Sequence, residues 1–239
     1  QELKNGNVRS LAGKQTPVGE KTFIDDLYIL GDFFDFWFCD TDHIHPEFQL
    51  MIAQLRELQQ AGVQIHLCEG NHDFFLKEYF QDVLGMEVFE EWADIRLDNL
   101  RAWVSHGDTA DRNDKTYLMF RNILRSRAFY HVQRYIPASL RWAIASTTSS
   151  VSKEINSDNR DILVEKRIPF ANEKFMSGYD AVIIGHCHMP VLKTFDLQGK
   201  KKTFITLGDW INHYSFLYYE NQQFYMGYYD PQSFTRGFL

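Results

Sequence analysis

Two histidines separated by a single residue are the first candidates for chemistry in this sequence. In segment 181–190, AVIIGHCHMP, an apolar run leads through a glycine to His186, Cys187 and His188. Side chains two apart point the same way in an extended segment, so both imidazoles would face one point while Cys187 turns away. Two imidazoles aimed together are typical of a metal site. One such pair is weak evidence, and the interpretation needs further ligands from the rest of the chain.

Three other apolar runs end in a turn that combines glycine with a possible metal ligand. In chain order these turns contribute Asp32, Asn71 and His106. The runs predict short strands, and the helical patterns between them favour a mostly parallel sheet. Because parallel strands end at the same edge of a sheet, we expect these three side chains to meet the histidine pair there. Each residue alone could instead cap the backbone of its own turn, which is the commoner role of Asp and Asn after glycine.

The ligand set predicts the kind of ion. Oxygen from Asp32 and Asn71, with nitrogen from three histidines, suits Mn²⁺, Fe²⁺ or Zn²⁺ better than Ca²⁺ or Mg²⁺. No inward-facing cysteine accompanies them, which disfavours a structural zinc site. Asn71 adds an oxygen without a charge, so the site would stay attractive to an anion such as phosphate. The two oxygens of Asp32 could bridge two ions about 3.5–4 Å apart, an arrangement that activates water for attack on phosphorus.

The elements that must position these residues are visible in the apolar patterns. Helical spacing predicts a helix over 47–61 and further helices within 115–145 and near 158–176. The strands that lead to the four turns are expected over 27–30, 63–68, 101–105 and 181–184. A hairpin around Asp98-Asn99 would add a strand over 94–97, and antiparallel strands are expected over 203–207, 215–219 and 224–229.

Composition limits the function classes. At 239 residues, with 44% hydrophobic and 24% charged residues, the chain is expected to form one globular domain over 1–239. It has no apolar run of membrane-spanning length and no leader pattern, so neither secretion nor membrane insertion is indicated. Its 3 cysteines form no C-x-x-C pair, which argues against a disulfide framework. A cytoplasmic location is therefore expected.

The net charge of −7 hides a basic segment. Residues 112–174 hold 12 Lys and Arg against 6 Asp and Glu, whereas the rest of the chain holds 13 against 26. An acidic body of this kind argues against bulk nucleic-acid binding, and we expect no nucleic-acid partner. The basic segment favours an anionic ligand or a membrane surface nearby. Its other interpretation is a solvated helical segment.

The order of the four turns resembles the motif series of the calcineurin-like metallophosphoesterases. The motifs are GDFFD from Gly31, GNHD from Gly70, HGD from His106 and GHCH from Gly185, and the match extends over roughly residues 26–210. Each motif alone is weak, but four in order are a strong signal. The resemblance implies an α/β fold of two packed mixed β-sheets flanked by helices, a four-layer sandwich.

The same resemblance implies roles for the turn residues. Asp32 would bridge two divalent ions, for which Mn²⁺ is expected, and His188 would serve one of them. His72 would sit beside the leaving group as a proton donor or as a stabiliser of the transition state. Apart from the resemblance, we expect Asp35 and Asp108 to orient ligand histidines rather than to bind an ion themselves. The shell of the other ion would be completed by Asn71, His106 and His186.

A narrower resemblance is to the UDP-2,3-diacylglucosamine pyrophosphohydrolases of lipid A synthesis. It rests on GDFFDFW from Gly31, HGDT from His106 with a helical insertion after it, and GHCHMP from Gly185. Enzymes of that group hydrolyse the pyrophosphate of an acylated UDP-sugar to UMP and a lipid monophosphate, and a helical cap holds the acyl chains.

The basic segment at about 112–174 occupies the position of that cap in the sequence. The resemblance implies an acyl groove there and peripheral contact with the membrane. A packed helical subdomain with solvated arginines is the alternative. The arginines expected to meet phosphate or the membrane surface are Arg121 and Arg125.

Two features depart from the resemblance. His72 stands where many members of the subgroup carry arginine, so a phosphoesterase of nucleotides or phosphoproteins is an alternative. The family also opens with a strand that ends in Asp-x-His, and residues 1–25 contain no histidine. We expect such a strand upstream of Gln1. Without it, the chain would be a non-catalytic scaffold with the family fold.

Overall fold

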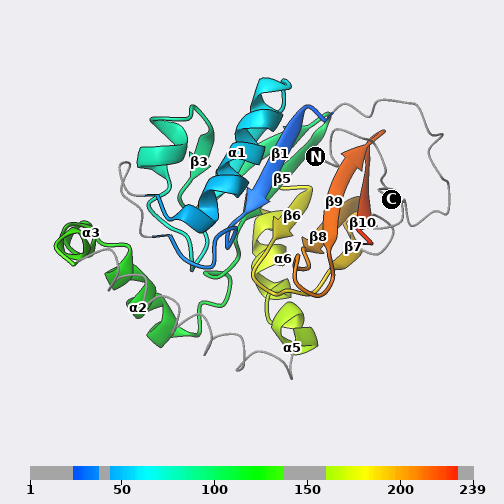
Figure 1. The fold of residues 1–239 in the computed structure, drawn as a ribbon. Helices are drawn as coiled ribbons and strands as arrows, with labels where there is room; N and C mark the ends of the chain where they lie inside the picture. Colours follow the sequence, from blue (N-terminus) through cyan, green and yellow to red (C-terminus); the bar gives the residue numbers. More distant parts are fainter. Residues whose placement is uncertain (1–23, 38–43, 137–159, 231–239) are drawn as a thin grey trace.

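A parallel sheet, a mixed sheet and an antiparallel hairpin, with helices packed on the two larger sheets, form the body of the molecule (Figure 1). The structure is a computed structural model, and it describes residues 24–37, 44–136 and 160–230. The combination of parallel and antiparallel pairing with flanking helices agrees with the predicted fold class.

The first sheet carries two of the four turns. It consists of three parallel strands, β1 (Asp26–Leu30), β2 (Gln64–Cys68) and β3 (Glu87–Phe89). The crossover from β1 to β2 is α1 (Pro46–Gln60), which begins with proline in its first turn. Its buried residues follow helical spacing and pack against one face of the sheet: Phe48, Ile52, Leu55 and Leu58. Because β1 and β2 run in the same direction, the turns that follow them lie next to each other.

The second sheet carries the other two turns. Its strand order is β4 (Trp92–Leu97), β5 (Leu100–Ser105), β6 (Ala181–Ile184), β8 (Lys200–Thr206) and β7 (Val191–Leu197). The central strands β5, β6 and β8 are parallel, whereas the edge strands β4 and β7 run antiparallel to their neighbours. Every residue of β6 is buried, which explains its uninterrupted apolar sequence.

The two sheets share a core. Leu30 of β1 packs in one cluster with Val104 of β5 and Ile183 of β6. The hairpin of β9 (Ser215–Glu220) and β10 (Gln223–Tyr228) contributes to the same cluster. The strand ends that carry the four turns are therefore close in space, although they are far apart in the sequence.

The segment expected to form a cap begins with two helices that project from the body (Figure 1). They are α2 (Lys115–Leu124) and α3 (Arg127–Arg134), which lie within the range 115–145 where helices are expected and are separated by a break at residues 125–126. The break occurs because Ser126 caps α3, accepting a hydrogen bond from a backbone N–H of its first turn. Residues 137–159 lie outside the described part of the chain, so the extent of the cap over 112–174 stays a prediction.

The helix expected near 158–176 is also divided. α5 (Arg160–Glu165) is followed by α6 (Ile168–Met176), which begins with Pro169 in its first turn. α6 packs on the outer face of the second sheet through Ala171 and Phe175. Across the described ranges, no helix is both long enough and apolar enough to cross a bilayer.

Candidate metal centre

Asp32 lies in a strained turn at the end of β1. Its φ is 53°, a left-handed conformation that residues other than glycine rarely adopt. Gly31 before it has no room for a side chain, since a Cβ would lie 2.6 Å from both Gly70 Cα and His106 Nδ1. The turn is thus packed directly against two other predicted turns. One carboxylate oxygen of Asp32 accepts a hydrogen bond from the His72 N–H at 3.0 Å.

A buried carboxylate, Asp73, ties this turn to the next one. One of its oxygens accepts the backbone N–H groups of Asp32 and Gly70, each at 2.8 Å. The other oxygen accepts those of Phe33 and Phe34 at 2.7 and 3.2 Å. Asp73 belongs to the second motif, but the sequence alone assigns it no role. Its carboxylate binds only backbone N–H groups, and such contacts leave no pattern of residue types in the sequence.

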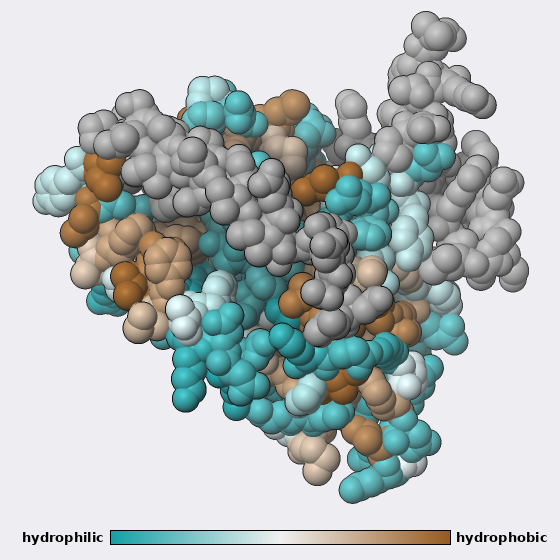
Figure 2. Space-filling model, turned by 90° about the horizontal axis from the view of Figure 1, so that it is seen from below, coloured by the Kyte–Doolittle hydropathy of each residue, from teal (hydrophilic) through white to brown (hydrophobic). Residues whose placement is uncertain are grey.

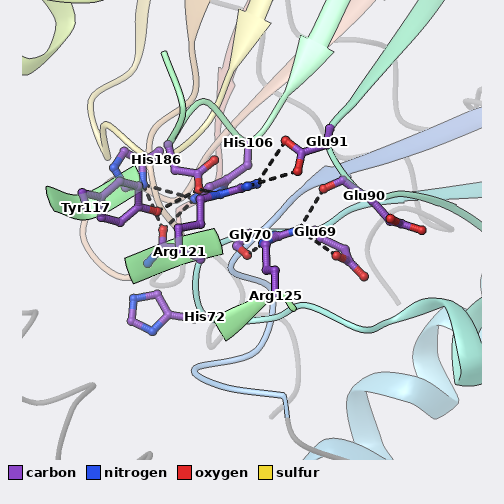
Figure 3. Close-up of polar contacts among 12 residues, drawn as sticks. Glu69, Gly70, His72, Glu90, Glu91, His106, Tyr117, Arg121, Arg125 and His186 are labelled. Atoms are coloured by element: carbon purple, nitrogen blue, oxygen red, sulfur yellow. Dashed lines mark hydrogen bonds and ion pairs between the residues drawn. The ribbon is translucent and has the colours of Figure 1, made fainter. Parts of the chain in front are cut away.

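Side chains from four turns converge next to the two turns that Asp73 joins. Figure 3 shows two of these side chains, His106 and His186, side by side. Asn71 Oδ1 lies 2.9 Å from His106 Nε2 and 3.0 Å from His186 Nδ1, and the two nitrogens are 3.1 Å apart. Asp32 Oδ2 lies 3.3 Å from the same His106 nitrogen. Ligand atoms of Asp32, His106 and His186 all fall within 4.8 Å of one another. The structure therefore brings together four of the five predicted ligands.

The spacing of these atoms fits one divalent cation. Ligands about 2.1 Å from an ion and at right angles to each other lie about 3 Å apart, close to the separations above. His106 Nδ1 lies 2.8 Å from the Leu30 carbonyl oxygen, which only accepts. The neutral ring therefore carries its proton on Nδ1, and its Nε2 lone pair faces the other ligands. One carboxylate, one amide and two imidazoles suit Mn²⁺, Fe²⁺ or Zn²⁺.

Burial and neighbouring charge set the protonation of these groups. Burial lowers the pKa of His186 to about 3, and the adjacent His106 adds to the effect, so the His186 ring is neutral. Burial also lowers the pKa of His106, but the Asp32 carboxylate outweighs it and raises that pKa to about 9. Burial raises the pKa of Asp32, but His106 outweighs it and holds the pKa well below its usual value. The centre attracts positive charge, and a divalent cation would compete with a proton for His106.

Comparison with known proteins identifies the family. The model of the calcineurin-like phosphoesterase family matches residues 12–190, a range that includes all four turns. The chain belongs to the calcineurin-like phosphoesterases. Enzymes of this family use divalent metal ions, and this phosphoesterase is a hydrolase.

Similar proteins share one name. A UDP-2,3-diacylglucosamine hydrolase from Pseudomonas entomophila is 33% identical over 187 residues, which cover 77% of each chain. The hydrolase of the same name from Vibrio atlanticus is 32% identical over 202 residues, or 84% of this chain and 82% of its own. That from Pseudomonas putida is 31% identical over 189 residues, again with 77% of each chain covered.

The histidine pair of the phosphoesterase is not extended, contrary to the expectation from alternation. His186 and His188 have φ values of 63° and 51°, and the Cys187 N–H bonds to the Gly185 carbonyl oxygen in a tight turn. Cys187 does turn away, into the core. Because of this turn, His188 lies outside the converging group, with its Nδ1 3.9 Å from an oxygen of Asp209. Its role as a ligand of a second ion stays a prediction.

Orientation of a ligand histidine by Asp35 or Asp108 stays a prediction, whereas the main chain orients the ring of His106. Its Nδ1 faces the Leu30 carbonyl, whereas Asp108 accepts hydrogen bonds from side chains of α2. Asp35 is exposed. His72 is half-buried beside Asp32, and its ring lies apart from the His106–His186 pair in Figure 3.

The two arginines expected to meet substrate lie in ion pairs of the phosphoesterase itself. The nitrogens of Arg121 and Arg125 donate to carboxylates at 2.6–3.2 Å, among them those of Asp108 and Glu69. A phosphate group would have to compete with these carboxylates. Contact between either arginine and substrate stays a prediction.

Proposed function

We propose that this phosphoesterase hydrolyses the pyrophosphate of UDP-2,3-diacylglucosamine, with UMP and a lipid monophosphate as products. The observation that carries the proposal is the convergence of four ligand side chains at one point, in a chain whose relatives bear that hydrolase name. The relatives suggest the substrate, and the ligand geometry supports the chemistry.

The converging side chains would hold one divalent cation, proposed to be Mn²⁺, which supplies a Lewis acid and a bound water of lowered pKa. Asp32 is the one negatively charged member among them. A dication therefore leaves a net positive centre, which favours binding of the pyrophosphate. Asp32 would also contact a second ion, together with His188.

His72 would act on the leaving group. Its backbone is held by the bond from its N–H to Asp32, which places the residue directly after the ligand Asn71. Half-burial leaves the ring accessible to a bound phosphate. We assign it proton donation to the leaving oxygen, or stabilisation of the charge that develops there.

The insertion would hold the acyl chains and contact the membrane surface. Met119, Phe120 and Ile123 of α2 and Val132 of α3 are each more than half exposed. Figure 2 shows hydrophobic side chains gathered over α2 and α3, beside a hydrophilic hollow. An apolar face in a basic segment is suited to an acylated substrate in an anionic membrane.

One residue favours a second candidate function. His72 stands where an arginine is common in enzymes with the acylated substrate, and histidine there is typical of phosphoesterases that act on nucleotides or phosphoproteins. An open polar cleft beneath the insertion would support this alternative, whereas an apolar groove supports the first proposal.

Release of UMP tests the proposal. Purified full-length protein with Mn²⁺ should release UMP from UDP-2,3-diacylglucosamine, measured by chromatography. It should act poorly on UDP-N-acetylglucosamine, which carries one acetyl group in place of the two long acyl chains. His186→Ala removes a ligand and should abolish turnover. Unchanged turnover in that variant would refute the mechanism, and equal rates on both substrates would favour the second candidate.

A further inference from the structure

Arg121 of α2 connects the insertion to the turn that carries His106 (Figure 3). Its Nε donates to Asp108 at 2.6 Å, two residues after that ligand. Its Nη1 and Nη2 donate to the two oxygens of Glu91 at 3.0 and 3.2 Å. All three nitrogens of the guanidinium are therefore engaged with carboxylates, and the side chain is only 7% exposed.

Arg125, four residues later at the C-cap of α2, reaches a second ligand-bearing turn. Its Nη2 donates to the Gly70 carbonyl oxygen at 2.7 Å, and Gly70 directly precedes the ligand Asn71. Its Nη1 donates to Glu69 and to the Glu90 carbonyl, both at 2.9 Å. Figure 3 shows these contacts fanning out from Arg125.

The Gly70 turn is confined from both sides. A Cβ on Gly70 would lie 2.3 Å from the backbone nitrogen and from a carboxylate oxygen of Asp32, so the turn has no space to move towards the centre. Arg125 binds the carbonyl oxygen of the same residue. The position of Asn71 is thereby fixed between the first motif and α2.

The carboxylates in this network need the arginines. Glu69 is 4% exposed and Asp108 is 5% exposed. A buried carboxylate that loses its cationic partner is strongly destabilised. If either arginine swung out to meet a phosphate, it would leave such a carboxylate behind, so the arrangement favours a fixed role for both.

We infer that Arg121 and Arg125 are positioning residues, through which α2 fixes His106 and Asn71 and thereby sets the affinity of the centre for its metal ion. The planar fork is required, because one guanidinium joins two carboxylates or a carboxylate and two carbonyls, whereas a lysine offers a single point charge. The inference rests on the metal centre of the proposed function and is independent of its substrate.

Lysine variants of the full-length protein test the inference. Arg121→Lys and Arg125→Lys keep the charge but lose the fork. Each is expected to weaken Mn²⁺ binding by about 10–100-fold, measured by isothermal titration calorimetry on the metal-free protein. The control is Arg112→Lys, at an exposed arginine of the same segment that pairs with Glu173 of α6. It is expected to leave the affinity unchanged.

Steady-state kinetics of the lysine variants distinguish a positioning role of Arg121 and Arg125 from a role in substrate binding. At saturating Mn²⁺ the lysine variants should regain most of kcat, with KM for UDP-2,3-diacylglucosamine unchanged. Unchanged Mn²⁺ affinity with a raised KM would overturn the inference and make both arginines substrate-binding residues. Should Arg121→Lys not fold, Glu91→Gln weakens the same fork from its exposed end and should lower Mn²⁺ affinity.

The calorimetric result also distinguishes this inference from the proposed substrate. Mn²⁺ binding by the unaltered protein without UMP release would count against the substrate alone. Failure of the unaltered protein to bind Mn²⁺ would overturn both the metal centre and the inference.

Discussion

Three of the predicted metal ligands have a strained backbone conformation. Asp32, His186 and His188 all hold left-handed conformations. Each costs about 1–3 kcal/mol for a residue that is not glycine, so surrounding bonds must hold the turns in place. Asp73 supplies such bonds for the first turn, through its contacts with the backbone of Asp32 and its neighbours. The first turn is thus held by bonds that do not depend on an ion.

Removal of the Asp73 carboxylate should loosen two turns at once. Asp73→Ala leaves four buried or half-buried N–H groups without their acceptor. We expect a loss of about 3 kcal/mol in the free energy of unfolding, measured with urea, and weaker Mn²⁺ binding. Asp82→Ala, at an exposed aspartate, should change neither quantity. Unaltered Mn²⁺ affinity in Asp73→Ala would show that the hydrogen bonds of Asp73 are not needed for metal binding.

The loop that contains Asp209 should respond to acid. Burial raises the pKa of this carboxyl group, but hydrogen bonds from the Asn212 and His213 N–H groups outweigh it and lower the pKa to about 2. A folded-state pKa below the ordinary value means that the ionised group stabilises the fold above pH 3.8, and that this stability is lost as the pH falls towards 2. Urea unfolding across that interval should show the loss.

Asp209→Asn provides the matched control for the acid response. It removes the titrating group and should flatten the dependence of unfolding free energy on pH in this interval. An equally steep dependence in the variant would assign the effect to other carboxylates.

At the level of elements, the sequence predicts most strands, including the largely half-buried β9 and β10, but misses β3 and β7. β6 is expected because its apolar run is continuous, and β2 is expected although Gln64 and His66 interrupt its apolar residues. β7 is an edge strand that alternates between exposed and half-buried residues, and β3 has only 3 residues. The hydrophobic pattern of neither segment is distinguishable from that of a loop. Both become strands through their pairing with neighbouring strands in the sheet.

The ligands could be predicted, but their supports could not. Asp32, Asn71 and His106 stand at strand ends, where residue type and a neighbouring glycine are visible in the sequence. The Leu30 carbonyl and the ion pairs of Arg121 depend on the exact placement of backbone and helix. That placement follows from packing between distant segments, which one sequence does not encode in any local pattern.

A methyl group at Gly70 should disrupt the contact between two strand ends. Its Cβ would lie 2.3 Å from backbone and carboxylate atoms of Asp32, so Gly70→Ala must displace one of the turns. We expect a large loss of Mn²⁺ affinity by calorimetry. Gly85→Ala is the control, since Gly85 also lies in a turn, with φ of 69°, but a Cβ there meets nothing within 4 Å. It should cost about 1 kcal/mol of stability and leave metal binding intact.

On the scale of the whole molecule, the exposed apolar face of α2 should mediate contact with lipid. A double variant, Met119→Ser with Phe120→Ser, should reduce sedimentation with anionic phospholipid vesicles several-fold, because apolar area no longer enters the interface. Leu50→Ser, on the exposed side of α1, should not. Equal reduction in both variants would show that membrane contact is not specific to the insertion.

The distribution of the four ligands has a consequence for biogenesis. They are recruited from Asp32 through to His186, so a growing chain cannot complete the centre until most of the protein has left the ribosome. Contacts between such distant segments form slowly, because the chain loses the entropy of closing a long loop before the contacts stabilise it. A cation captured by the finished site then stabilises the folded state alone, by mass action. Metal loading therefore reports that the chain has been synthesised and folded at least as far as His186.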